Sequence, residues 1–393
     1  EKEATKIIEL LGLAYPLLKQ HVDSSDHAEG RFRFAHGDVG TAIRDLALQI
    51  TKATSGWLGR LEVLEDTLSE ALSDKQYPVP LPDIELFYQQ AGNWLGRAEK
   101  LLALWDRLHK ELQQNAVPMA CWLKLDEGVG GNIDISINAS PIQAAEILRD
   151  SLWGSCYAAV ITSATLRSLG NFNALQRETG MPSSANFLAV AGAFDYAAAA
   201  TLRVPNDAVE GNAVDEHSRY IVDNFETLIE ERAGTLLLFS SKRQMEQVYD
   251  ELPRDLHKLI LIQGQYSNRE MVRLHKERID QGRTSILMGL ASFAEGVDLP
   301  GDYCKHVVIA KLPFAVPDDP LQEALAEWIE DNGGNSFFDI SLPVASLRLI
   351  QACGRLLRTE KDTGTVTILD KRLLTKRYGM QLLNALPPFR REI

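Results

Sequence analysis

Three side chains near the C-terminus have the types and spacing to bind a phosphate group. Residues 351–358 read QACGRLLR, and on a helix Gln351, Arg355 and Arg358 would lie three or four residues apart on one side. Arginine offers planar donors that match phosphate oxygens, and it stays charged at any relevant pH. The spacing predicts a helix over 346–357 whose other side is apolar, formed by Leu347, Ile350, Gly354 and Leu357. For the octet alone, a surface helix with two solvated arginines is the alternative interpretation.

A parallel sheet is the element expected to position this helix. From about residue 203 the chain alternates strands and helices, a pattern typical of a parallel sheet flanked by helices. Each strand ends in small or polar residues, which predicts one functional rim along the sheet. The expected strands are 235–239, 259–262, 285–288, 307–310 and 365–369. The expected helices are 242–252, 268–279, 320–331 and a basic helix after the last strand.

In residues 116–166 the spacing of apolar residues changes from the period of a helix to that of a strand. Alternating residues predict strands at 121–125 and 133–137, with the glycine-rich segment 128–131 as a hairpin turn. That segment lacks a following Lys-Ser/Thr, so it does not read as a phosphate loop. Ser140 and Pro141 predict the start of a helix that runs to about residue 153.

A buried strand is expected at 158–161, and it leads into the small hydroxyl residues of 162–166, TSATL. Such residues at a strand's carboxyl end are where α/β sheets place ligand contacts. A helix cap by Ser163 or Thr165 is the alternative interpretation of this segment.

Residues 1–115 are expected to be all-helical. Apolar residues recur every three or four positions, for example at Leu58, Leu61 and Leu64. The proline-rich segment 77–82 predicts an extended connection between helices. Such repeats are typical of bundle core, and no catalytic constellation emerges among them.

Composition limits the class of protein. The chain has 393 residues, a net charge of −13 and ordinary hydrophobic content, which suggests two or three domains and argues against a histone-like sheath for nucleic acid. No apolar run approaches the ~20 residues that span a membrane, and no secretory signal pattern is present. The four cysteines, Cys121, Cys156, Cys304 and Cys353, form no C-x-x-C pair, so no metal site is predicted and a reducing, cytoplasmic compartment is expected.

The order of motifs resembles a known family. SATL after a strand, then LLLFSS, IQGQ, FAEGVDLPGD and QACGRLLR follow the order of superfamily-two helicases of the XPD-like branch. The residues of the last two motifs, together with the segment DKRLLTKRYG, are similar to those of the bacterial DinG-like members. The resemblance covers residues 116–393, and the helical residues 1–115 fit the position of that family's arch domain.

The resemblance implies a RecA-like, P-loop NTPase-like α/β fold plus an all-α arch-like domain. It divides the chain into an arch-like domain (1–115), the C-terminal portion of RecA-like lobe one (116–202) and RecA-like lobe two (203–393). It also implies a motor that hydrolyses ATP with Mg²⁺ between two lobes and moves 5′ to 3′ along single-stranded DNA.

The same resemblance assigns roles to individual residues. Gln351, Arg355 and Arg358 would reach the γ-phosphate, the arginines as catalytic fingers, and Glu295, Gly296, Asp298 and Gly354 would lie at the nucleotide cleft. Ser163, Ala164 and Thr165 would couple nucleotide state to DNA. The expected DNA contacts are Ser240, Ser241, Gln263, Gly264, Ser292 and Phe293.

Several family features are missing from the sequence. It contains no G-x-x-x-x-G-K-[ST] and no Asp-Glu-x-His, and it lacks the four clustered cysteines that hold a [4Fe-4S] cluster in this family. We therefore expect the C-terminal part of a helicase, inactive alone, with these features in a preceding part.

Two alternatives belong to other classes of protein. The chain could be a non-catalytic module that binds single-stranded nucleic acid and acts through a partner, since the Walker lysine is absent. An unrelated α/β enzyme is disfavoured because no nucleophile–base pair emerges. As a helicase part, it is expected to act as a monomer on single-stranded and on forked or structured DNA, with no membrane contact.

Overall fold

The computed structural model describes residues 2–23, 30–73, 78–111, 117–127, 133–229, 231–315 and 319–393. These residues form two compact units. The first contains residues 1–143 and 317–333, and the second contains residues 144–316 and 334–393. The division differs from the expected boundary at 115/116, because the hairpin after residue 116 packs with the N-terminal helices. The assignment of arch and lobes to 1–115, 116–202 and 203–393 stays a prediction.

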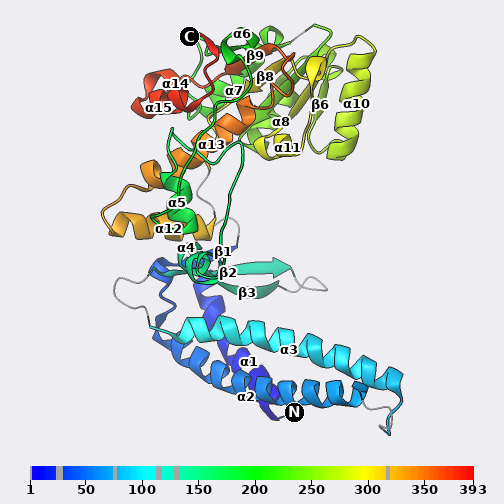
Figure 1. The fold of residues 1–393 in the computed structure, drawn as a ribbon, viewed down its shortest axis with the longest axis vertical. Coiled ribbons are helices and arrows are strands. Elements are labelled where there is room, and N and C mark those ends of the chain that lie inside the picture. Colours follow the sequence, from blue (N-terminus) through cyan, green and yellow to red (C-terminus); the bar gives the residue numbers. More distant parts are fainter. Residues whose placement is uncertain are drawn as a thin grey trace. The chain divides into compact units, whose positions relative to one another are not determined.

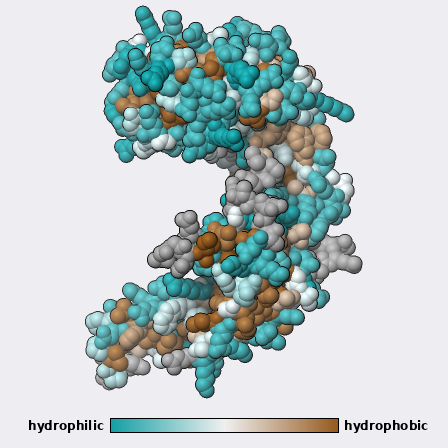
Figure 2. Space-filling model, turned by 180° about the vertical axis from the view of Figure 1, so that it is seen from behind, coloured by the Kyte–Doolittle hydropathy of each residue, from teal (hydrophilic) through white to brown (hydrophobic). Residues whose placement is uncertain are grey.

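Three long helices dominate the first unit: α1 (Lys2–Asp23), α2 (Gly40–Ser73) and α3 (Leu81–His109) (Figure 1). Both α2 and α3 bury small and large residues, among them Ala71, Ala98 and Trp105. Leu64 of the apolar repeat is nevertheless 42% exposed, and several brown patches are visible on the molecular face in Figure 2.

A small antiparallel sheet completes this unit. It consists of β1 (Arg31–Phe34), β2 (Met119–Glu127) and β3 (Ile133–Pro141), in that order. The expected hairpin pairing is confirmed by the register Glu127↔Ile133, while the turn at 128–132 lies outside the described residues. Strand β1 shows that residues 1–115 are not all helical. The predicted helix start at Ser140 and Pro141 is wrong, because the cross-strand pairing continues through both residues.

Helix α12 (Pro320–Asp331) has the predicted bounds but packs in the first unit, against β2 and the short helix η1 (Ala35–Gly37). Arg33 bonds Glu323 through Nε at 3.0 Å and Glu327 through Nη1 at 2.8 Å. Glu327 also accepts the backbone N–H of His36 at 2.7 Å. Arg33 and Glu327 are each only 19% exposed, so this charged pair is largely removed from solvent.

Removing Arg33 should loosen α12. Arg33→Ala is expected to cost about 2 kcal/mol, because two charge-assisted hydrogen-bonded partnerships are lost in a half-buried place. Hydrogen exchange of the β2 and β3 amides is the measurement. Lys124→Ala, which breaks the exposed pair Lys124–Asp126, is the matched control and should cost less than about 0.5 kcal/mol. Equal effects of the two variants would contradict this account of the α12 contact.

The second unit is built on a seven-stranded sheet of order β10-β4-β9-β8-β5-β7-β6, in which every pairing is parallel. The expected α/β class with a parallel sheet is confirmed. The strands are β4 (Ala200–Arg203), β5 (Gly234–Phe239), β6 (Ile260–Ile262), β7 (Ser285–Leu290), β8 (His306–Ile309), β9 (Gly364–Ile368) and β10 (Arg390–Glu392).

Both faces of the sheet are covered (Figure 1). Along β5, Leu236 and Leu238 join one core while Leu237 and Phe239 join the other, as the period of two in a strand requires. Helices α10 (Asn268–Asp280), α13 (Leu342–Cys353) and α15 (Arg377–Ala385) contribute to the first core. Helices α7 (Val214–Asp223), α8 (Lys242–Glu251) and α9 (Arg254–His257) contribute to the second.

Short helices complete the second unit. They are α4 (Ala145–Leu148), η2 (Arg149–Trp153), α5 (Asn173–Thr179), α6 (Tyr196–Ala199), η3 (Phe225–Leu228), α11 (Ala291–Glu295), η4 (Gly301–Tyr303), η5 (Phe337–Ser341) and α14 (Arg372–Thr375).

The predicted buried strand at 158–161 is wrong. This segment has no regular structure, and Val160 is 91% exposed. A strand requires a neighbour to accept its backbone hydrogen bonds, and no strand in the described part of the chain pairs with it. A second apolar segment also has no regular structure, and its residues Leu188 and Val190 are more than 80% exposed.

Candidate nucleotide cleft and sheet rim

An open cleft of about 620 Å³ in the second unit brings the predicted phosphate-binding residues together. Such a volume lies within the usual range for a small-molecule site. Gln351, Gly354, Arg355 and Arg358 line it, with Ala164 and Thr165 of the SATL segment. Two predicted groups that are separated by almost 190 residues in the chain therefore line one cleft.

The local structure at the two arginines differs from the prediction. Helix α13 ends at Cys353, four residues earlier than expected, and Arg355 and Arg358 follow in the turn after it. Gly354 caps the helix, and the buried residues Leu356 and Leu357 anchor the turn in the core. The arginines are therefore presented by a turn and not by one face of a helix.

Both arginines converge on one backbone carbonyl. Arg358 donates from Nη2 to Val297 O at 3.1 Å, and Arg355 donates from Nη1 to the same oxygen at 3.4 Å. Arg358 Nε also lies 3.3 Å from Oδ1 of Asp298, whose side chain is 76% exposed. The loop after β7 is thus in contact with the turn that carries the arginines.

Gln351 connects the cleft to the SATL segment. Its amide Nε2 donates to the Thr165 hydroxyl at 3.3 Å. Within the segment, Ser163 Oγ accepts the backbone N–H of Thr165 at 3.3 Å, so Ser163 shapes a local turn. Ser163 and Ala164 are exposed, whereas Thr165 is half-buried.

Asp362 holds the turn after α13, which carries Arg355 and Arg358, and the sequence analysis assigned it no role. Its carboxylate accepts the backbone N–H groups of Arg358 at 2.7 Å and Thr359 at 2.8 Å, and that of Gly301 at 3.1 Å. Burial opposes ionisation, yet these donors and the Thr359 hydroxyl together hold the pKa of Asp362 below its usual value. An acid four residues after Arg358 is the only signal in the sequence that could have indicated it.

Acid should loosen this turn. Because the pKa of Asp362 is depressed in the folded chain, its contribution to stability is complete above pH ~4 and is lost as pH falls through the folded pKa. Urea unfolding between pH 6 and pH 3 measures this loss, and Asp362→Asn should show less of it because the charge is already gone. Parallel pH profiles for the two proteins would contradict the role of Asp362.

An aromatic wall closes another side of the cleft. Phe194, Tyr196 and Phe389 line it, and Tyr196 lies 5.7 Å from each of the other two rings, centroid to centroid. The sequence reasoning assigned no role to these residues. They come from segments with no motif, and only folding brings them together.

The predicted rim residues lie on neighbouring strand ends. In the sheet order β8-β5-β7-β6, Ser240 follows β5, Ser292 follows β7, and Gln263 and Gly264 follow β6. Ser241 caps α8 by accepting the Gln244 N–H, and Gln263 Oε1 accepts the Leu290 N–H at 2.8 Å. These two side chains therefore also support the rim.

One predicted residue, Phe293, is placed differently. Phe293 is 3% exposed and packs in the core, so its side chain is not on a DNA-facing surface, whereas Ser292 is exposed. Its ring lies against Gly289, where an added Cβ would come within 2.8 Å. Gly296 is exposed, and the Glu295 side chain lies outside the part that the structure describes.

The rim also carries a cation that was not assigned a role. Lys311 follows β8 and is half-buried beside Asp370 and Arg372. Burial, and then the Arg372 cation, lower the pKa of Lys311, while Asp370 partly opposes them. The residue stands at the position where the strand pattern predicts ligand contacts.

Comparison with known proteins supports the interpretation of this unit. A family model described as "Helicase C-terminal domain" matches residues 225–389. This segment contains the rim of β5 to β9 and the turn that carries Arg355 and Arg358. Residues 225–389 are therefore similar to helicase C-terminal domains.

Curated relatives extend the similarity across the chain. The ATP-dependent DNA helicase DinG of Photobacterium profundum is 37% identical over 98% of this chain and 56% of its own length. The Escherichia coli K12 protein of the same name is 32% identical over 98% of this chain and 53% of its own length. The chain spans about half the length of these relatives, and the resemblance to DinG-like helicases is confirmed.

Among solved structures, one titled "XPD_Helicase" has a TM-score of 0.48 and 14% identity, covering 96% of this chain and 67% of its own. No helix in the described residues is long and apolar enough to cross a membrane. No group of three or more His, Cys, Asp or Glu among the described residues is arranged to hold a metal ion.

Proposed function

We propose that this chain is the C-terminal part of an ATP-dependent DNA helicase that moves 5′ to 3′ on single-stranded DNA. The observation that carries the proposal is the convergence of Arg355 and Arg358 on Val297 O, in a cleft also lined by Thr165. The order of motifs and the similarity to helicases named DinG support it.

In this proposal the two arginines act as catalytic fingers. Phosphoryl transfer spreads negative charge over three oxygens in the transition state, and an inserted arginine is worth roughly 10³- to 10⁵-fold in rate. When the cleft closes on ATP, the γ-phosphate oxygens would replace Val297 O as acceptors. Gln351 would join them, and its contact with Thr165 would report the nucleotide state to the SATL segment.

The rim would hold the DNA backbone. Ser240, Ser292 and the loop at Gly264 offer hydroxyl and main-chain donors, which contact phosphates without reading sequence. Lys311 would add a positive charge among them.

A preceding part would complete the nucleotide site. The donors described above fit a terminal phosphate, but the sequence holds no P-loop lysine and no Asp-Glu-x-His acid, so ATP and Mg²⁺ would be bound mainly by that other part. The exposed apolar segments around Val160 and Leu188 are surface that the remainder of lobe one would cover. The chain alone is therefore expected to be inactive.

The cysteines of this chain do not fit a [4Fe-4S] cluster. Three are buried separately, and burial raises the pKa of Cys121 to about 11 and of Cys304 to about 12, which disfavours the thiolates that ligate iron. A cluster would be held by the preceding part. We further propose that the whole protein acts as a cytoplasmic monomer on forked or structured DNA.

Strand separation by the whole protein tests this proposal. Forks with only a 5′ single-stranded tail should be unwound with ATP, and forks with only a 3′ tail should not. The reverse preference would overturn the proposed direction. Binding without ATP hydrolysis would favour a non-catalytic module, for which the absent P-loop is the supporting observation.

A further inference from the structure

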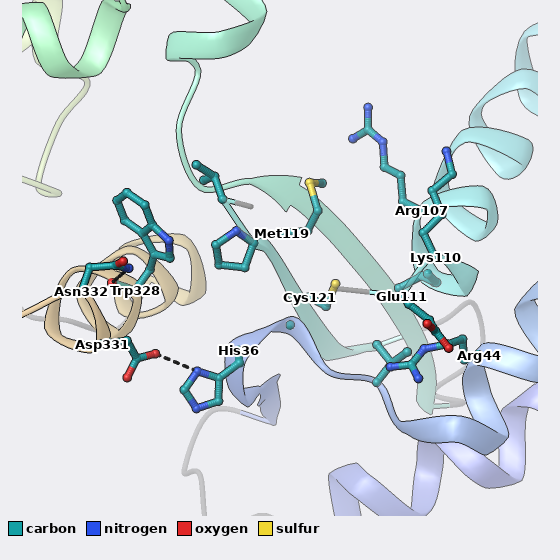
Figure 3. A pocket seen from close by; sticks show the side chains of 15 residues that line it. His36, Arg44, Arg107, Lys110, Glu111, Met119, Cys121, Trp328, Asp331 and Asn332 are labelled. Carbon is teal, nitrogen blue, oxygen red and sulfur yellow. Dashed lines mark hydrogen bonds and ion pairs between the residues drawn. The ribbon is translucent and has the colours of Figure 1, made fainter. Parts of the chain in front are cut away.

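The first unit contains a cavity of about 980 Å³ that the motor mechanism does not use (Figure 3). Helices α2, α3 and α12, strand β2 and the short helix η1 all contribute to its lining. Its described wall combines apolar groups, among them Val39, Leu108, Pro118, Met119 and Trp328, with the cations Arg44, Arg107 and Lys110.

The cations come from helix termini that meet at the cavity. Arg107 and Lys110 lie three residues apart at the end of α3, both are exposed, and they point the same way in Figure 3. Lys110 pairs with Asp106 at 2.6 Å, but the lysine is 62% exposed, so a phosphate could replace this partner at little cost. Arg44 donates from Nη2 to Asp38 at 2.7 Å.

The two acids that line the cavity lie beside other polar side chains. Asp331 lies 3.0 Å from the His36 ring, and Glu111 is drawn beside Arg44 in Figure 3. Arg107 and Lys110 are the exposed cations of the lining.

Trp328 supplies a flat aromatic surface. It lies on α12, is partly buried against Ala120 and Ile142, and is drawn beside the β2 end of the cavity in Figure 3. Because its helix is held by the Arg33 ion pairs, the ring is positioned before any ligand binds. An aromatic ring and cations that line one cavity are the combination that binds unpaired bases and their phosphates.

We propose that this cavity binds single-stranded nucleic acid, with a base against Trp328 and phosphates at Arg107 and Lys110. The inference rests on the proposed function and adds a DNA contact outside the helicase C-terminal domain. A duplex is not the expected ligand, because its bases are stacked inside and cannot reach a ring in a cavity. An acidic peptide would use the cations but not the ring.

The test uses the complete 393-residue chain and a fluorescent oligothymidine whose anisotropy reports binding. Arg107→Glu with Lys110→Glu should weaken binding about tenfold or more, since two phosphate contacts are reversed in charge. The matched control is Arg97→Glu with Lys100→Glu, which has the same spacing on the exposed surface of α3 and the same net charge but lies outside the cavity lining. The control should bind within about twofold of the unmodified chain.

A variant of the ring and a crosslinking measurement on the unmodified chain, whose fold is unaltered, complete the test. Trp328→Ala should weaken binding about tenfold, and 4-thiothymidine oligonucleotides should crosslink the unmodified chain at the Trp328 and Met119 peptides. Equal losses in the cavity and control variants, or competition by polyglutamate equal to that by oligothymidine, would overturn the proposal. Crosslinks confined to the rim at Ser240 and Gly264 would overturn it while leaving the helicase function intact. If the unmodified chain bound no oligothymidine at all, both the cavity proposal and the proposed DNA contacts of the rim would be overturned.

Discussion

Arg358→Ala in the whole protein is expected to lower DNA-stimulated ATP hydrolysis by about 10³-fold or more. The guanidinium already reaches Val297 O and Asp298 from the turn after α13, so it is placed for a phosphate without rebuilding the loop. Single-stranded DNA binding should stay nearly unchanged, because the expected DNA contacts follow β5, β6 and β7, whereas Arg358 follows α13. Steady-state hydrolysis at saturating DNA is the measurement.

Lys361→Ala is the matched control for this prediction. Lys361 is an exposed cation three residues further along the same loop, and it does not line the cleft. Its removal should change turnover by less than about twofold, as expected for a solvated charge. Unchanged turnover in Arg358→Ala would show that this arginine is not a catalytic finger.

Asp370→Asn is expected to destabilise the second unit by about 3–5 kcal/mol, a large share of an ordinary domain's stability. Asp370 is fully buried at the end of β9, and Arg372, its ion-pair partner at 2.6 Å, is only 12% exposed. The carboxylate also accepts the backbone N–H groups of Gly211 at 3.1 Å and Leu312 at 3.0 Å. Losing its charge would remove the ion-pair partner of the largely buried Arg372 guanidinium.

The structure explains why this one carboxylate matters to the rim. It joins the loop at Gly211, the segment after β8 and the segment after β9, which surround Lys311. Burial opposes its ionisation, but Arg372 and the backbone donors hold the pKa of Asp370 below its usual value. Hydrogen exchange of the β8 and β9 amides measures the loss in this unit alone. Asp302→Asn, at an exposed acid paired with Lys305, is the control and should cost less than about 0.5 kcal/mol. A similarly small loss in Asp370→Asn would contradict this role.

The sheet was predictable because its signals are local. Apolar runs bounded by turn residues predicted β5 to β9 to within a few residues. That Gln351, Arg355 and Arg358 line one cleft was predictable, because all three stand within the eight residues 351–358. The C-terminal end of α13 was not predictable. Gly354 ends the helix through its local backbone geometry, which a pattern of residue spacing does not contain.

Other features depend on contacts between distant segments. The docking of α12 on β1 and β2 rests on Arg33 meeting two glutamates almost 300 residues away, which no period reveals. The segment at 158–161 has the composition of a strand but lacks a partner in the described chain, so composition alone was misleading. Asp362 and Asp370 resemble ordinary loop acids until the structure shows their burial.

ATP hydrolysis by this chain alone, with and without single-stranded DNA, tests the central claim most directly. The account predicts no turnover under either condition, together with DNA binding that weakens steeply as salt rises, because phosphate contacts release counterions. Clear DNA-stimulated turnover would contradict it, since a complete nucleotide site would then have to lie within these 393 residues.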